Sequence, residues 1–182
     1  MFTCDSIIRF FIKHLPIGTN MKVNNQPFAD RLSVEQIEEG IELAPKFDIN
    51  GLIPVITSDY KSGELLMHGY MNSDALRQSI ETGEAYYWSR SRRLIWHKGA
   101  TSGLTQEIIE MRIDDDQDAL WLRVKVGGSG ASCHVGYRSC FYRVIPTQIP
   151  VEDAVKLLAF TEDEKVFNPK EVYGDVPNPT KI

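Results

Sequence analysis

The chain has 182 residues, of which 42% are hydrophobic and 25% charged, as in an ordinary globular protein. This composition excludes wholesale disorder and a coiled coil, and no apolar run reaches the ~18–20 residues that a membrane span needs. The net charge of −5 argues against nucleic acid as a partner, because duplex-DNA binders carry a basic excess. The 3 cysteines are too few for a disulfide scaffold, and their odd number indicates a reducing compartment, which we take to be the cytoplasm.

The N-terminal segment contains a short apolar run, but Arg9 and Lys13 interrupt it. A secretory signal needs ~7–15 uninterrupted apolar residues after a basic start, so we predict no signal peptide. We interpret residues 1–30 as an N-terminal extension that need not be ordered, residues 31–160 as a single domain and residues 161–182 as a C-terminal tail.

Capping signals and helical spacing predict three helices. Ser33 with Gln36 fits a capping box that opens the first, with Ile37 and Ile41 on one face. The second helix is expected to begin at a Ser73 cap, to end at Gly83 and to bury Ala75, Leu76 and Ile80. A third helix is expected over 152–158.

Runs of apolar or alternating residues between turn signals predict the strands. The clearest run is 120–126, where apolar side chains alternate with Trp121, Arg123 and Lys125, as in a strand with one buried face. Many strands with few helices between them favour an α+β fold, and we expect a largely antiparallel, barrel-like sheet with a few short helices. The predicted strands are 52–57, 64–70, 85–89, 94–97, 105–113, 120–126 and 141–145.

Between two of these strands lies an acidic turn that contains Asp114, Asp116 and Asp118. Alternate carboxylates can converge on one hard cation, since Mg²⁺ and Ca²⁺ prefer oxygen ligands. The alternative interpretation is a solvated acidic hairpin turn.

Cys133 and Cys140, with His134 beside the first, form a second cluster. Thiolates and imidazole suit Zn²⁺, and a catalytic zinc needs a third protein ligand and keeps its fourth position for water. Inert buried thiols and a disulfide are the alternatives, although a reducing compartment argues against the disulfide.

A third cluster is basic and rich in hydroxyl groups. Its guanidinium, ammonium and hydroxyl groups are donors for phosphate oxygens, and Gly99 and Gly103 let the backbone approach a ligand closely. The alternative is a polar strand face with an exposed basic loop. Together with a zinc-acidified water, phosphate recognition predicts hydrolysis of a phosphorylated small molecule. The candidate donors are Arg90, Ser91, Arg92, Lys98, Thr101 and Ser102.

The order of these motifs resembles the phosphoribosyl-AMP cyclohydrolase family of histidine biosynthesis. The resemblance covers roughly 44–145 and rests on Tyr87-Trp88-Ser89-Arg90-Ser91-Arg92, Lys98-Gly99, Thr101-Ser102-Gly103, the spaced aspartates and Cys133-His134-x-Gly136-x-x-Ser139-Cys140. It implies hydrolysis of the N1–C6 bond of the adenine ring of 1-(5-phosphoribosyl)-AMP by a zinc-activated water. It also implies an obligate homodimer, with active sites at the subunit interface and zinc ligands from both chains.

The resemblance also implies roles for single residues. Cys133 and Cys140 are expected to bind zinc, and His134 to act as general acid and base. The three spaced aspartates, Asp114, Asp116 and Asp118, are expected to bind Mg²⁺, which assists substrate binding. The six donors of the basic cluster are expected to hold the two phosphate groups.

One position departs from the family pattern. The family usually has cysteine between the first two aspartates, as a third zinc ligand, and this chain has Asp115. A carboxylate is a harder donor than a thiolate but can bind zinc, so we take Asp115 as the third ligand. His97 is a second candidate. A weakened zinc site is the other alternative, which would make the chain a catalytically silent phospho-nucleotide-binding relative. A redox sensor that uses the thiol pair is a further alternative.

Overall fold

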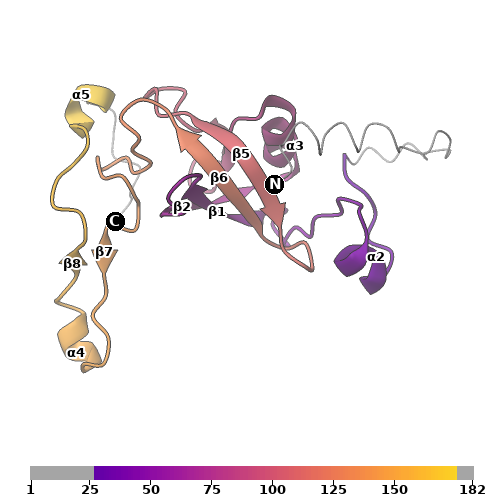
Figure 1. Cartoon of the computed structure of the whole chain (residues 1–182), viewed down its shortest axis with the longest axis horizontal. Helices are drawn as coiled ribbons and strands as arrows, with labels where there is room; N and C mark the ends of the chain where they lie inside the picture. Colours follow the sequence, from indigo (N-terminus) through magenta and orange to yellow (C-terminus); the bar gives the residue numbers. More distant parts are fainter. Residues whose placement is uncertain (1–26, 176–182) are drawn as a thin grey trace.

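The computed structural model describes residues 27–175, which form a four-stranded sheet, two smaller sheets and short helices (Figure 1). The predicted extension 1–30 lies almost entirely outside the described residues, as does the end of the predicted tail. Within the described range, no helix has both the length and the apolar character needed to cross a membrane. The elements are α2 (Val34–Glu39), β1 (Ile53–Asp59), β2 (Leu65–Met71), α3 (Ser73–Thr82), β3 (Tyr86–Ser89), β4 (Leu94–His97), β5 (Gln106–Ile113), β6 (Leu120–Val126), β7 (Arg143–Val144), α4 (Val151–Ala154), β8 (Ala159–Phe160) and α5 (Pro169–Tyr173).

The main sheet has the strand order β2-β1-β6-β5. β1 pairs with β2 and β5 with β6 in antiparallel fashion, whereas β1 and β6 are parallel, with Val55 opposite Leu120. The expected α+β fold and largely antiparallel pairing are confirmed. The expected barrel-like closure is wrong, because β2 and β5, the outer strands of the main sheet, do not pair with each other. The β3–β4 hairpin lies between them instead: β3 packs against β2, and Glu84 just before it bridges to Glu107 of β5.

One face of the sheet carries the core. Leu120, Leu122 and Val124 of β6 are at most 2% exposed, whereas Trp121 is 36% exposed on the other face, so the predicted alternation is confirmed. Ala75 and Leu76 of α3 complete the same core.

The first helix, α2, begins as predicted and ends early. The Ser33 hydroxyl accepts a hydrogen bond from the Gln36 N–H at 3.1 Å. The helix stops at Glu39 because Gly40, its C-cap, is extended, with ψ −179°. Ile41 therefore lies beyond the helix and is 93% exposed, which corrects its predicted place on one helix face with Ile37.

The second helix, α3, is capped one residue earlier than predicted. Asn72, not Ser73, is the N-cap, and its side-chain oxygen accepts from the Ala75 N–H at 2.9 Å. Gly83 ends the helix in the left-handed conformation with φ 72°, as expected. Ile80 is 49% exposed, so its predicted burial is wrong.

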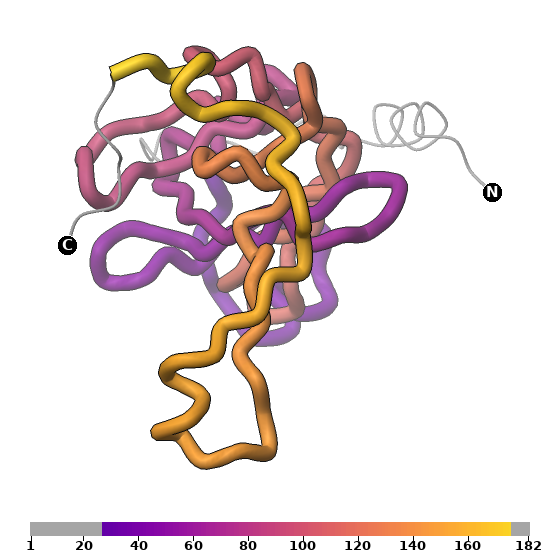
Figure 2. The backbone as a smooth tube through the Cα atoms, turned by 90° about the vertical axis from the view of Figure 1, so that its left-hand side faces the viewer, coloured from indigo at the N-terminus to yellow at the C-terminus, as the bar shows by residue number. Residues whose placement is uncertain are grey.

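The region after β6 has little regular structure. The strand predicted at 141–145 is reduced to the two residues of β7, and the helix predicted at 152–158 to the single turn α4. α5 lies in the segment that the sequence predicted as a tail. Figure 2 shows β7, α4 and β8 in an arm that extends away from the body of the protein.

Candidate active site

The thiol loop, residues 131–140, brings the two predicted zinc ligands together. The side chains of Cys133 and Cys140 are hydrogen-bonded to each other, and both cysteines are free thiols. Cys133 is buried, whereas Cys140 is exposed. The Cys140 N–H donates to the Leu66 carbonyl at 2.7 Å, which fastens the loop to the beginning of β2. The sequence spacing of seven positions is therefore compatible with one shared metal ion.

The thiol pair is arranged to hold one negative charge. The hydrogen bond from Cys140 lowers the pKa of Cys133 to about 6, assisted by the backbone N–H groups of Val135 and Tyr137 and by the nearby Lys98 ammonium. The same hydrogen bond, together with the negative charge of the neighbouring Cys133, raises the pKa of Cys140. A thiolate is the form of cysteine that binds metals and attacks electrophiles. His134 directly follows Cys133 and is half-buried.

A buried series of hydrogen bonds connects the thiol loop to the core of the protein. The Thr57 hydroxyl lies 2.7 Å from the Tyr87 hydroxyl, which donates to the Gln106 side-chain oxygen at 2.8 Å. The Gln106 amide in turn donates to the Ser132 hydroxyl at 3.2 Å, next to Cys133. All four residues are at most 3% exposed. No local sequence pattern predicts these hydrogen bonds, because they join four distant segments.

Lys98 packs against the thiol loop rather than lying among exposed phosphate donors. It is 3% exposed, and its ammonium donates to the Ser132 carbonyl at 2.9 Å. Burial lowers its pKa. The sequence grouped Lys98 with the phosphate donors, and the structure places it beside the two sulfur atoms.

The segment after the arm also fixes the thiol loop. The Glu162 carboxylate accepts from the Arg138 and Ser139 N–H groups at 2.7 and 3.0 Å. The Val166 N–H donates to the Gly136 carbonyl at 2.9 Å. Part of the predicted tail is thus a structural element of the candidate site.

The acidic turn forms the β5–β6 connection, and its alternate carboxylates converge as predicted. One oxygen each from Asp114, Asp116 and Asp118 lie within 4.8 Å of one another. Opposite ligands of an octahedral Mg²⁺ lie ~4.2 Å apart, so these side chains fit a hard cation after small adjustments. Gln117, with φ 58° and 5% exposure, fixes the turn: its side chain accepts from the Ala44 N–H at 2.8 Å.

A lysine already neutralises part of this charge. The Lys46 ammonium lies 2.8 Å from Asp116 and 3.1 Å from Asp118, and its hydrogen bond lowers the pKa of the Asp116 carboxyl. No local sequence pattern predicts this role of Lys46, which lies about seventy positions before the aspartates.

The acidic turn and the thiol loop lie at opposite ends of the sheet. Ile113, just before the turn, pairs with Leu120, whereas Gln106, which contacts the thiol loop, pairs with Val126 at the far end of β6. The six steps from Leu120 to Val126 span about 20 Å at ~3.3 Å per residue. Asp115 is exposed on the turn and cannot reach a zinc ion held by the thiols of its own chain.

His97 is also occupied away from the thiols. Its Nε2 lies 2.8 Å from the Glu84 carboxylate, and its ring stacks on Tyr86 with centroids 4.4 Å apart.

The predicted phosphate donors are divided between the two ends of the β3–β4 hairpin. Arg90, Ser91 and Arg92 form the exposed turn between the strands, and the Arg90 guanidinium lies 4.1 Å from the centre of the Tyr70 ring. Thr101 and Ser102 lie in the loop after β4; the first is exposed and the second half-buried. The turn at 90–93 is an open, cationic surface that suits an anionic ligand.

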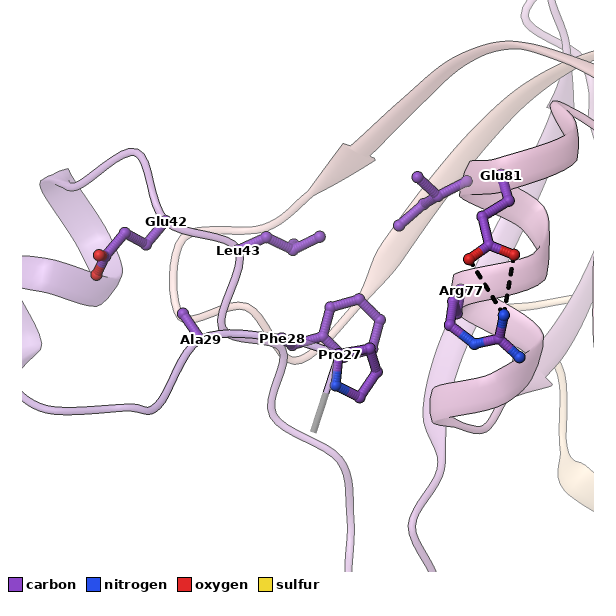
Figure 3. Close-up of a pocket in the computed structure, with 8 residues that line it drawn as sticks. Pro27, Phe28, Ala29, Glu42, Leu43, Arg77 and Glu81 are labelled. Carbon is purple, nitrogen blue, oxygen red and sulfur yellow. Dashed lines mark hydrogen bonds and ion pairs between the residues drawn. The ribbon is translucent and has the colours of Figure 1, made fainter. Parts of the chain in front are cut away.

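A groove of about 470 Å³ lies elsewhere, between residues 27–29 and α3 (Figure 3). Phe28, Leu43 and Ile80 line it, and the Arg77–Glu81 ion pair stands at its side. None of the thiols, aspartates or phosphate donors lines it, so chemistry rather than cavity size places the candidate site at the thiol loop.

Comparison with known proteins gives the family. A family model for phosphoribosyl-AMP cyclohydrolase matches residues 67–142, which include the basic turn, the acidic turn and the thiol loop. The chain belongs to this family. It is 49% identical over 139 residues to the phosphoribosyl-AMP cyclohydrolase of Rhodopseudomonas palustris (strain BisA53), a match that covers 76% of this chain and 92% of the relative. It is 48% identical over 138 residues to that of Bradyrhizobium diazoefficiens, covering 76% and 94%. The resemblance found in the sequence is confirmed.

Proposed function

We propose that the chain hydrolyses the N1–C6 bond of the adenine ring of 1-(5-phosphoribosyl)-AMP, a step of histidine biosynthesis, in the cytoplasm. The alignments with two relatives of that name cover 92% and 94% of their lengths, which supports the reaction. The observation that carries the chemistry is the hydrogen-bonded thiol pair with a lowered pKa at Cys133. Water adds its oxygen to C6, the C6–N1 bond breaks, and a proton passes to N1.

Zinc is the metal that fits the thiol loop. Cys133 and Cys140 offer two soft donors within reach of one ion, as tetrahedral zinc sites require. Zinc bound there would supply a water whose pKa is low enough for attack near neutral pH. His134, adjacent to Cys133, takes the proton from the attacking water and delivers it to N1. Lys98, buried beneath the loop, holds it in place through the Ser132 carbonyl.

The third zinc ligand in this proposal is Asp115 of a second copy. The chain that supplies the two thiols cannot also supply Asp115 to them, because about 20 Å of β6 separates its acidic turn from its thiol loop. His97 is less suited, since Glu84 and Tyr86 already hold its ring. A homodimer with shared sites removes the separation. It also explains why one chain carries both groups so far apart.

Asp114, Asp116 and Asp118 are the proposed ligands of a magnesium ion, which would help to hold the substrate phosphates. The Lys46 ammonium would yield its place to the ion. Arg90, Ser91 and Arg92 bind one phosphate group at the exposed turn, and Thr101 and Ser102 bind at the other end of the hairpin.

Ring opening, followed by ultraviolet absorbance, tests the proposed reaction. Purified protein is assayed as isolated, after treatment with a zinc chelator, and after zinc is restored. We expect turnover that chelation abolishes and zinc recovers. If zinc-loaded, folded protein binds phosphoribosyl-AMP and never opens the ring, the chain is a silent phospho-nucleotide-binding relative, which is the alternative that Asp115 favours.

The contact between the two thiols favours a redox sensor as a second candidate. Reversible disulfide formation in protein with no zinc affinity would support it. Zinc that protects both thiols from alkylation would exclude it.

A further inference from the structure

The flanking segment, which we define as residues 161–167, connects β8 to α5 and lies beside the chain that leads from β6 to β7 (Figure 1). It runs antiparallel to the thiol loop, because its contacts advance along the chain while those of the loop go back. The contacts join Glu162 to Ser139, Lys165 to Tyr137 and Val166 to Gly136. The flanking segment also lies beyond residue 142, where the match to the family model ends.

Glu162 uses both oxygens of its carboxylate on the main chain of the thiol loop. One accepts from the Arg138 N–H at 2.7 Å and the other from the Ser139 N–H at 3.0 Å. Such charge-assisted hydrogen bonds are stronger than those between neutral groups. The guanidinium of Arg138 pairs instead with Asp59 and Glu64. Glu162 therefore orders the main chain of the loop rather than neutralising its arginine.

The two N–H groups that Glu162 holds lie directly before Cys140. On the other side of the loop, the Cys140 N–H donates to the Leu66 carbonyl at 2.7 Å, and the Ser139 hydroxyl donates to the Leu65 carbonyl at 2.6 Å. The main chain at the second thiol is thus fastened to β2 on one side and to the flanking segment on the other. Removing Glu162 releases one of these two attachments.

We propose that Glu162 is a positioning residue of the metal centre, which holds Cys140 where it and Cys133 can bind one ion. The proposal rests on the proposed function, in which zinc binds both thiols. Zinc that finds its ligands in place does not bear the cost of ordering them, so loss of the Glu162 contacts weakens zinc binding. Removing a group that orients metal ligands typically lowers metal affinity about 10–100-fold.

Zinc affinity of the full chain, measured by competition with a chromogenic chelator, tests the proposal. Glu162→Ala removes both acceptor oxygens, whereas Glu162→Gln keeps one. Glu164→Ala removes the same charge from an exposed residue two positions away and is the matched control. We expect the dissociation constant to rise at least ~10-fold in Glu162→Ala, to rise less in Glu162→Gln, and to stay within ~2-fold of the wild type in the control.

Urea unfolding of the metal-free proteins separates positioning from stability. If Glu162 only stabilised the fold, its variants would unfold at lower urea concentrations, but the folded fraction would bind zinc as tightly as the control, and this result overturns the proposal. An equal loss of zinc affinity in the control overturns it too. If neither variant folds, amide hydrogen exchange in the metal-free wild type decides: protection of the Arg138 and Ser139 N–H groups supports the proposal, and rapid exchange of both overturns it.

These measurements do not depend on turnover. A wild type that binds zinc, with the expected losses in the Glu162 variants, and never opens the ring supports the role of Glu162 and contradicts the proposed reaction. A wild type that binds no zinc overturns the zinc site and the role of Glu162 together, whether or not it opens the ring.

Discussion

Gln106→Leu is expected to destabilise the protein and to loosen the thiol loop. Gln106 is fully buried, and leucine has nearly the same volume, so the substitution removes polar contacts without opening a large cavity. The Ser132 hydroxyl loses its donor, and the Tyr87 hydroxyl keeps only Thr57. Leaving a buried polar group without its partner costs about 1–3 kcal/mol, so we expect a loss of about 2–6 kcal/mol from two affected groups.

Urea unfolding measures this loss, provided that the slope with urea concentration does not change. Zinc affinity, measured by competition with a chromogenic chelator, is expected to fall in the same variant, because Ser132 adjoins Cys133. Gln78→Leu, the same substitution on the half-buried surface of α3, serves as the control and should stay within about 0.5 kcal/mol of the wild type. A Gln106→Leu protein as stable as this control would refute the role assigned to the buried series of hydrogen bonds.

Three further predictions concern other parts of the site. Gly99→Ala should lower the free energy of unfolding in urea by at least about 2 kcal/mol, because Gly99 has φ 87° and an added Cβ would lie 2.1 Å from the Thr105 nitrogen. Gly63 serves as the control, since it has φ 75° with open space around it, and Gly63→Ala should lower that free energy by only about 1 kcal/mol. Equal losses of stability in the two variants would contradict the steric argument. Lys46→Met should tighten Mg²⁺ binding several-fold in calorimetric titration, since it removes an ammonium that competes for Asp116 and Asp118; an unchanged or weaker affinity would count against the magnesium site. Hydrogen bonds from Arg123 and Arg112 lower the pKa of Glu110. The contribution of Glu110 to stability, below about 1 kcal/mol, is therefore present above the unfolded pKa of ~4.3 and disappears as the pH falls through the lower folded pKa. Glu110→Gln should flatten this acid dependence of the unfolding free energy, and an unaltered pH profile would argue against the pairing.

Local chemistry predicted most of the fold. Alternation over β6, the capping box at Ser33 and the left-handed Gly83 all act within a few residues, so the sequence displays them directly. Closure of the sheet depends on which distant strands become neighbours, and no local pattern shows that the β3–β4 hairpin stands between its edges. The error at Ile80 has the same origin, because its exposure depends on what lies opposite α3.

The residues of the candidate site likewise fall into those that local sequence predicts and those that it does not. The aspartates and the thiols were predictable, since each set is close in sequence and their donor types suggest a metal. Lys46, Gln106 and Glu162 were not, because each reaches its partners from a distant segment. The separation of Asp115 from the thiols also required the strand register.

Subunit complementation tests the central claim, a cyclohydrolase whose zinc site takes the thiols from one chain and Asp115 from the other. Cys133→Ser and Asp115→Ala proteins are prepared separately, then unfolded together and refolded as a mixture. Each alone should open almost no rings. In the mixture, half of the dimers are hybrids and each hybrid holds one intact site, so about a quarter of wild-type activity should return. An Asp115→Ala protein with full activity, or a mixture of hybrid dimers as inactive as its parents, would contradict the account.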